Sequence, residues 1–386
     1  MQKTSLTLAF AAIIAISFAE PVASQEILDD LVVVPGGEDA PVVEIDDAEE
    51  IALVGYHSVC TDGACTDCPT CKKSCYDECC RPKKCSPPWW AHRTGIFGEF
   101  LYLRPGDTDV LYTIEQNDTT ANAFPTGPTG IAAIDANAGY RVGFSLANTN
   151  TTSLYAAFTR WEGATSDSTA RMGANILNSQ IIHPSTATTG ANSLQSTANT
   201  SMDFTTIDVA YRHKLFCTDT TIFNWYGGFR YGQMEQSLLA QQDISVATGL
   251  VTVDSDIDFS GFGLLIGIDA ERRSCKSGML CYSKGFASFL GGEWEGTYTQ
   301  TNQLGGGIVA NQFEDFRISP VVETEIGIGW QNDSGCIRAT TGYMASWWTN
   351  ALNTRTYVQG VRSASFHALD QTIGFIGLTS RLELRY

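Results

Sequence analysis

The sequence has little charge and no excess of basic residues. Charged side chains make up only 17% of it, against roughly 25% in an ordinary soluble domain. Lys and Arg number 24 and Asp and Glu 42, a net charge of −18, which argues against a nucleic-acid-binding protein because such proteins carry a basic surface. Long apolar runs are also lacking, since the longest covers residues 6–19 and is too short to span a bilayer as a helix. An exported, β-rich protein fits this composition best.

The N-terminus predicts export. Lys3 precedes the apolar run, and small residues follow it up to Ser24, the pattern of a secretory signal peptide. We therefore predict a signal peptide over residues 1–24, cleaved after Ser24, with Ala19 as the alternative cleavage position. The competing interpretation of this run is a buried N-terminal helix.

An acidic segment follows over residues 25–57. It contains ten acidic residues and no Lys or Arg. Self-repulsion and a shortage of aromatic residues predict a disordered spacer.

A cysteine-rich segment covers residues 58–88. In an exported chain, an even number of closely spaced cysteines predicts disulfides. The spacing from Cys65 to Cys75 also matches a bacterial iron–sulfur run, and its C-x-x-C pairs could bind zinc. Tyr76 replaces the expected proline of the cluster motif, and the compartment is oxidising, so we predict no metal and no cofactor. The disulfide candidates are Cys60, Cys65, Cys68, Cys71, Cys75, Cys79, Cys80 and Cys85 here, with Cys217, Cys275, Cys281 and Cys336 further on.

The remainder, residues 89–386, predicts an antiparallel up-and-down transmembrane β-barrel. Segments of about ten residues alternate apolar with small or polar side chains and are rich in Gly and aromatics, which is the signature of such barrels. The last segment ends the chain on Tyr386 with apolar residues at every second position before it. We predict ten strands, at about 95–105, 137–147, 151–162, 202–213, 221–238, 256–271, 280–298, 313–331, 336–349 and 371–386.

The connections between these strands alternate between long and short. The first, 106–136, and the third, 163–201, are long and polar, whereas the second and fourth are tight turns. Outer-membrane barrels have long extracellular loops and short periplasmic turns, so both ends of the barrel are expected in the periplasm. The even strand count agrees with bacterial barrels, and twelve strands is the alternative. Cys217, Cys275, Cys281 and Cys336 fall in the short connections, where Cys275 and Cys281 flank one turn.

Charged residues recur on the face opposite the apolar one. A charge facing lipid at mid-bilayer costs about 2–4 kcal/mol for Arg or Lys, so these residues are expected inside the barrel. One interpretation is a water-filled pore; the other is a salt-bridged polar core that conducts nothing, because barrels of about eight strands are filled by their own side chains. The candidate pore-lining residues are Arg141, Asp208, Arg230, Asp269, Glu323, Glu325, Arg338, Arg381 and Glu383.

Aromatic residues near strand ends are expected to form girdles at the membrane interfaces. They are Trp161, Trp294, Trp330, Trp347, Trp348 and Tyr386.

No catalytic motif is present in the sequence, so we predict no enzyme activity. Asp370 and His367 lie close together in the last long connection, and a rim enzyme built on them is a separate hypothesis. A soluble exported sandwich is a further one.

Several strand segments resemble the Legionella-type pore-forming major outer-membrane protein family. They are residues 97–103, 139–143, 207–212, 225–231, 262–267 and 342–348. The resemblance covers about residues 95–386 and implies an outer-membrane β-barrel that acts as a porin, with no catalytic residues to transfer. The acidic and cysteine-rich segments lie outside it.

The predicted function is therefore passive passage of small solutes or ions across the bacterial outer membrane, with a closed anchoring barrel as the alternative. The expected partners are outer-membrane lipid and the barrel-assembly machinery, which would recognise the last strand up to Tyr386. Another envelope component, bound by the cysteine-rich segment, is a further hypothesis. No nucleic acid is expected to bind.

Overall fold

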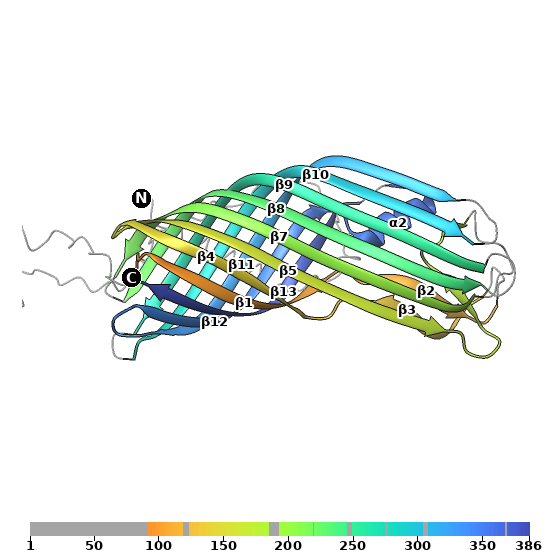
Figure 1. The fold of residues 1–386 in the computed structure, drawn as a ribbon, viewed down its shortest axis with the longest axis horizontal. Helices are drawn as coiled ribbons and strands as arrows, with labels where there is room; N and C mark the ends of the chain where they lie inside the picture. The colour runs from red at the N-terminus through yellow and green to blue at the C-terminus, as the bar shows by residue number, and fades with distance from the viewer. Residues whose placement is uncertain are drawn as a thin grey trace, which may run out of the picture. The chain divides into compact units, whose positions relative to one another are not determined.

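The computed structural model describes residues 91–118, 123–184, 193–218, 220–244, 249–274, 277–303, 308–366 and 369–386. The predicted signal peptide, acidic spacer and cysteine-rich segment lie outside the described residues. Ten antiparallel strands close into a barrel (Figure 1). In order around the ring they are β1 (Gly95–Gly106), β4 (Asn137–Thr149), β5 (Thr152–Ala170), β7 (Ser193–Cys217), β8 (Thr221–Ile244), β9 (Gly249–Arg273), β10 (Met279–Asn302), β11 (Val309–Gln331), β12 (Ile337–Ala351) and β13 (Gln371–Arg385).

The first and last strands of the barrel pair with each other and close the ring. Glu99 of β1 stands opposite Arg381 of β13 on one side and opposite Arg141 of β4 on the other. The prediction of ten barrel strands is confirmed, and the twelve-strand alternative is wrong. Closure leaves no free sheet edge, which is the condition for a sheet to span a bilayer.

The barrel has one end with short turns and one end with long connections. We call the end where β4–β5, β7–β8, β9–β10 and β11–β12 are joined the turn end, and the opposite end the loop end. The C-terminus of β13 lies at the turn end.

Two connections at the loop end are much shorter than the sequence predicted. β8 and β9 are separated by residues 245–248, and β10 and β11 by residues 303–308. The residues predicted as long loops instead extend β7 to β11, which are 23 to 25 residues long. The pattern of apolar-outward strands did not detect these extensions, because their polar residues face outward and their apolar residues face inward.

The outer face changes from apolar to polar along one line of cross-strand partners. Six acidic residues on six consecutive strands stand directly opposite one another in register and point away from the interior; we call them the acidic row. They are Glu162, Asp203, Glu235, Asp258, Glu295 and Glu314.

On the turn side of the acidic row, large apolar side chains cover the outer face, and this is the apolar band. Leu264 and Ile326, for example, are 60% and 65% exposed. On the loop side, the outward residues are mainly Ser, Thr, Gln and Asp, as in the run Thr297, Thr299 and Thr301 of β10. The outer surface is therefore suited to contact lipid on the turn side of the acidic row and water on its loop side.

Next to the acidic row, the inner face of the barrel changes from polar on the turn side to apolar on the loop side. Residues of five neighbouring strands, one position away from the acidic row, form an inward row of large apolar side chains: Trp161, Phe204, Met234, Phe259 and Trp294. Toward the turn end the interior is polar and charged, whereas toward the loop end it holds a continuous apolar core. The same strands thus form two halves of one barrel. The turn-end half is apolar outside and polar inside, like a membrane barrel, and the loop-end half is polar outside and apolar inside, like a water-soluble barrel.

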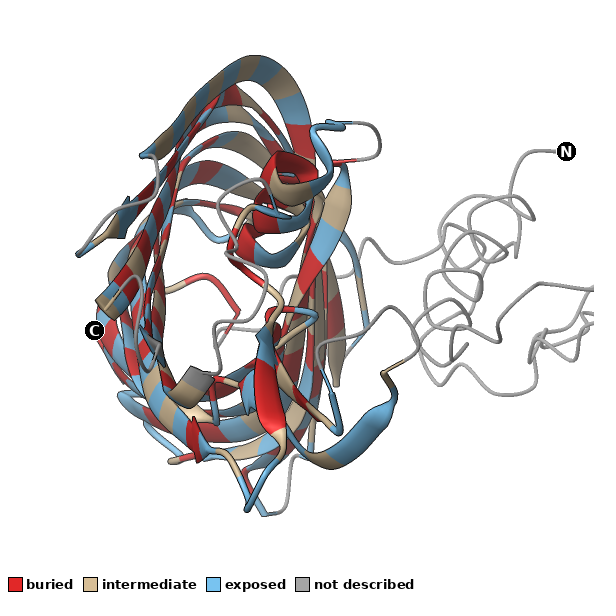
Figure 2. Cartoon of the chain, turned by 90° about the vertical axis from the view of Figure 1, so that its right-hand side faces the viewer, coloured by how far each residue is buried: buried red, intermediate tan, exposed pale blue. Residues whose placement is uncertain are grey.

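A plug of inserted segments fills the loop-end half. It consists of a three-stranded sheet, in the order β3 (Pro125–Ala132), β2 (Val110–Gln116) and β6 (Ile176–Ser179), and helix α2 (Thr354–Ser363). Tyr112, Ala132 and Val358 of the plug belong to the same apolar core as wall residues such as Leu238 and Tyr298. Figure 2 looks into this end and shows α2 within the ring of strands, with several of its residues buried.

The helix begins where Asn353 caps it. The Asn353 side chain accepts a hydrogen bond from the Arg355 backbone amide at 2.8 Å, which satisfies one of the amides left free at a helix start. Among the described residues, no helix, α2 included, is long and apolar enough to cross a membrane.

Charge placed on the apolar band is expected to destabilise the protein in a membrane far more than charge placed above the acidic row. Leu264→Arg should cost about 2–4 kcal/mol of unfolding free energy in lipid vesicles, because its guanidinium must leave water. Thr299→Arg, on the outward face of the loop-end wall, should change stability by less than about 0.5 kcal/mol. Urea unfolding in vesicles measures both, and equal losses would contradict this placement of the bilayer.

Candidate functional site

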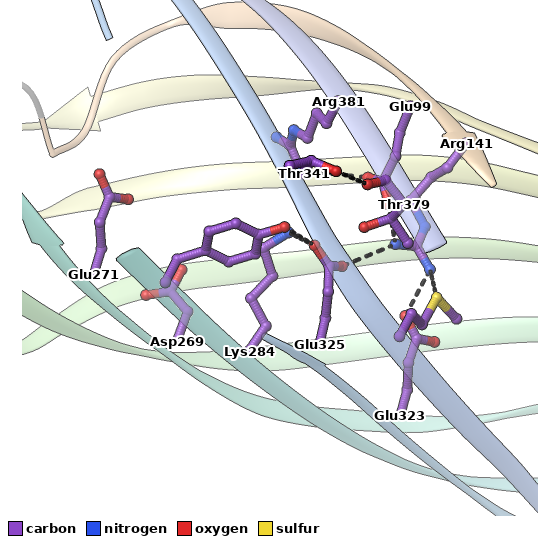
Figure 3. A network of polar contacts seen from close by, with 12 residues as sticks. Glu99, Arg141, Asp269, Glu271, Lys284, Glu323, Glu325, Thr341, Thr379 and Arg381 are labelled. Carbon is purple, nitrogen blue, oxygen red and sulfur yellow. Dashed lines mark hydrogen bonds and ion pairs between the residues drawn. The ribbon is translucent and has the colours of Figure 1, made fainter. Parts of the chain in front are cut away.

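All nine sequence-predicted lining residues lie on the inner face of the turn-end half. Each forms an ion pair with another interior residue. The side chain of Arg381 is the most accessible, at 14%, and the other eight are less than 10% exposed. Shared ion pairs join seven of them into one network, part of which Figure 3 shows, while Asp269 and Arg338 form separate pairs beside it.

Arg141 is at the centre of this network. Its guanidinium lies 3.1 Å from Glu99, 2.6 Å from Glu323 and 3.7 Å from Glu325, and its Nε donates to Thr159 at 3.0 Å. Arg141 is on β4 and the last two glutamates are on β11, four strands away around the ring. These ion pairs therefore cross the lumen.

A second guanidinium bridges the opposite wall to the same glutamate. Arg230 of β8 binds both oxygens of Asp208, at 2.6 and 2.8 Å, and its Nη2 lies 3.3 Å from Glu323. Glu323 thus joins two arginines from two sides of the barrel. Two-point guanidinium–carboxylate pairs of this kind fix both side chains in position.

The rest of the network extends toward the turn end. Lys284 and the Tyr282 hydroxyl both donate to Glu325, at 3.1 and 2.6 Å. The remaining pairs are Arg212–Asp269, Arg338–Glu271, Arg381–Glu383 and Arg385–Glu383.

Equal numbers of basic and acidic side chains form these ion pairs. Among the described residues, seven basic side chains meet seven acidic ones: Arg141, Arg212, Arg230, Lys284, Arg338, Arg381 and Arg385 against Glu99, Asp208, Asp269, Glu271, Glu323, Glu325 and Glu383. Glu99, Arg212, Glu271, Lys284 and Arg385 were not among the predicted lining residues. Strand periodicity could have found Glu271 and Arg385, because each follows a predicted lining residue by two positions.

The space left inside this network is small. A cavity of about 50 Å³ lies among Arg141, Asp208, Tyr226, Lys284 and Arg338. That volume accommodates a few water molecules.

A layer of aromatic side chains closes the interior between the network and the plug. Six rings form a connected series, with centroid distances from 4.5 to 6.3 Å. In order of contact they are Trp294, Phe259, Trp348, Phe204, Phe375 and Trp161, which we call the aromatic layer.

The prediction of an aromatic girdle at the membrane interfaces is wrong for three of its residues. Trp161, Trp294 and Trp348 are buried in the interior, whereas Trp330 and Tyr386 are exposed on the outer face. All three buried tryptophans lie on the loop side of the network, where the inward positions of the wall carry apolar side chains. Apolar-outward alternation therefore assigned them to the wrong face.

Polar contacts hold α2 against the wall above this layer. The Tyr357 hydroxyl donates to the Gly296 carbonyl at 2.9 Å, and burial raises the pKa of Tyr357 to about 12. Gln236 donates to the Leu352 carbonyl at 2.8 Å. Arg362 donates to the carbonyls of Ile182 and Ser179, which ties the helix to the end of β6.

The disulfide predictions have a mixed outcome. Cys281 and Cys336 are free thiols, so their assignment as disulfide partners is wrong in this structure. Cys281 is not in a turn but in β10, pointing outward, which separates it from the interior. The eight cysteines of the leader and Cys275 lie outside the described residues, and Cys217, at the end of β7, stays a disulfide candidate.

No cluster of His, Cys, Asp and Glu with the makings of a metal site occurs in the described ranges. Of the two residues proposed for a rim enzyme, Asp370 lies 3.8 Å from Arg317, and His367 falls outside the described residues.

Comparison with known protein families supports the location. The family described as Legionella pneumophila major outer membrane protein precursor matches residues 88–382. No curated protein matches the sequence. Similar solved structures include the Pseudomonas putida toluene transporter TodX (8% identity, 77% of this chain and 90% of that chain, TM-score 0.34) and the transport unit of the Escherichia coli autotransporter AIDA-I (10% identity, 76% and 89%, TM-score 0.23).

The protein is therefore located in the bacterial outer membrane. Short turns of outer-membrane barrels face the periplasm and long loops face outside. The turn end, with the ion network, is accordingly the periplasmic end, and the plug fills the extracellular half.

Removing Arg230 should destabilise the barrel strongly. Arg230→Met leaves Asp208 buried without its guanidinium, and breaking a buried pair on one side costs about 3–5 kcal/mol. The double variant Arg230→Met with Asp208→Asn should recover part of this loss, because no unpaired charge remains at Asp208. Urea unfolding of both variants in vesicles measures the difference, and a single variant within about 0.5 kcal/mol of the natural protein would contradict the network's importance.

Acidification should loosen the segment that leads into β1. His92 lies between Ser153 and Asn224, at 3.2 and 3.1 Å, and burial, followed by the nearby charge of Arg212, lowers its pKa from 6.5 to about 4. Folding therefore favours neutral His92, so its contribution to stability is intact above pH 6.5 and is lost as the pH falls toward 4. Asp269 and His213 also face this group.

The loss in stability between pH 7 and pH 4 should be smaller for His92→Gln than for the natural protein. Thermal unfolding in detergent at both pH values gives the comparison. Identical pH dependence in the two proteins would show that His92 does not contribute.

Proposed function

This chain belongs to the Legionella major outer-membrane protein family, and on that premise we propose that it is an outer-membrane pore with a closed resting state. Small solutes or ions pass when the plug leaves the extracellular half of the barrel. In the conformation described, the ion network, the aromatic layer and the plug lie one after another along the lumen.

The observation that carries this proposal is the charged interior of the membrane-embedded half. Replacing buried ion pairs by packed apolar side chains is often neutral or stabilising, so a barrel that only anchors itself gains little from fourteen interior charges. The same strands use apolar filling in their extracellular half. A polar lining restricted to the lipid-surrounded half is what passage of water and solutes requires.

The plug is separate from the wall in its backbone pairing. The β3–β2–β6 sheet forms its own ladder and is no part of the closed ring. Helix α2 is bound to the wall by side-chain contacts such as that between Tyr357 and Gly296. Movement of these segments would therefore leave all barrel ladders intact.

A closed structural or anchoring barrel is the second candidate. It is favoured by the single apolar core that unites plug and wall and by the small cavity in the network. Neither candidate includes a catalytic step. Recognition of the strand ending at Tyr386 by the assembly machinery and tethering by the cysteine-rich segment stay predictions.

Loosening the plug should increase conductance. A side chain at Gly296 would meet Tyr357 and Leu352, since a Cβ there lies 3.1 Å from the Tyr357 ring and 3.3 Å from Leu352. Gly296→Leu should displace α2 and raise the frequency of discrete openings in planar bilayers at least tenfold over the natural protein, which is expected to open rarely.

Gly98→Leu is the matched control. Gly98 points outward from β1, and a Cβ there has no neighbour within 4 Å, so the same substitution should leave conductance unchanged. Protease resistance checks that each variant is folded and inserted. If neither the natural protein nor folded Gly296→Leu conducts ions in planar bilayers, the pore is rejected and the closed barrel is established.

A further inference from the structure

The aromatic layer is built entirely by the barrel wall. Trp161, Phe204, Phe259, Trp294, Trp348 and Phe375 come from β5, β7, β9, β10, β12 and β13. None of the six belongs to the plug. Movement of the plug out of the barrel would therefore leave these rings in the lumen.

The rings reach one another across the lumen. Phe204 of β7 lies 4.7 Å from Phe375 of β13 and 6.1 Å from Trp348 of β12, measured between ring centroids. In the ring of ten strands, β7 and β12 stand five positions apart, on opposite sides. Phe259 of β9 also contacts Trp348 at 6.3 Å. Wall side chains alone thus bridge the full width of the barrel here.

Small residues on the wall hold two of these rings in place. A Cβ at Gly261 would come within 2.5 Å of the Phe259 ring, and one at Gly163 within 2.7 Å of the Trp161 ring. The rings lie against bare backbone at both positions. This packing and the inter-ring contacts are made by wall residues alone.

The layer also separates two different environments. Phe204 and Phe259 are followed, toward the periplasm, by inward positions that include Asp208 and Asp269 of the ion network. Toward the outside they are followed by Met202 and Ile257 of the apolar core. A solute moving along the lumen must cross this layer, because it occupies the lumen at the level where the two halves meet.

We propose that the aromatic layer is the selectivity constriction of the open pore, slowing hydrated ions more than small uncharged solutes. Apolar constrictions block ions by excluding the water that hydrates them, and an uncharged solute loses far less on leaving water than an ion does. This inference rests on the proposed function, since it concerns the pore after the plug has moved.

The test combines plug and ring substitutions in the full-length protein. The background is Gly296→Leu, and Phe204→Ala with Phe375→Ala is introduced into it. The matched control is Phe262→Ala in the same background, because Phe262 is 58% exposed on the apolar band. Unitary potassium conductance in planar bilayers and glycerol-driven swelling of vesicles are measured for each, with protein-free vesicles as the blank.

The expected result is at least a threefold rise in unitary potassium conductance on removing the two rings, with a smaller rise in glycerol permeation. Phe262→Ala should match the Gly296→Leu background, and the two ring substitutions without Gly296→Leu should stay as quiet as the natural protein. Trp348→Leu in the background provides a second ring variant if the double substitution does not fold.

Two other outcomes separate the failures. Conducting Gly296→Leu channels whose potassium conductance does not change on ring removal would overturn the constriction and leave the pore in place. Absence of conductance from every folded variant would overturn the pore itself.

Discussion

The structure depends on one constraint, which is that the alternation of apolar and polar side chains reverses along a line that crosses six consecutive strands of the barrel. Below the acidic row the strands are apolar outside and polar inside; above it they are polar outside and apolar inside. Because successive side chains of a strand point to opposite faces, reversing the pattern changes both surfaces together. Lipid contact, the ion network and the plug all follow from this reversal.

The two halves reach stability by different means. The extracellular half buries an apolar core shared by wall and plug, as a water-soluble barrel does. The membrane half has no water outside it to favour apolar burial inside, and its interior is held by ion pairs such as those of Arg141 and Arg230 that cross the lumen. Such pairs add little net free energy compared with apolar packing, but the loss of one partner leaves an unpaired charge, so the network is sensitive to single substitutions.

Function is thereby linked to the boundary between the halves. A barrel with a polar lumen throughout would stand open, and one with an apolar core throughout would be sealed. In the proposed function the polar half is the route for solutes through the bilayer, and the apolar half supplies both a plug from the connections and a layer of rings from the wall. Closure can therefore be relieved by moving segments without unpairing the barrel strands.

The sequence by itself determined the barrel, its ten strands and the inward side of residues such as Arg230 and Glu323, because lipid outside a sheet permits only one alternation. It did not determine which charges pair, since Arg141 and Glu323 are 182 positions apart and meet only when the ring closes. Sequence periodicity also placed Trp161, Trp294 and Trp348 on the wrong face, and it predicted the loop-end parts of β7 to β11 as loops. Local periodicity is the same for either facing, and only the closed barrel, with its plug inside, decided that these tryptophans point inward.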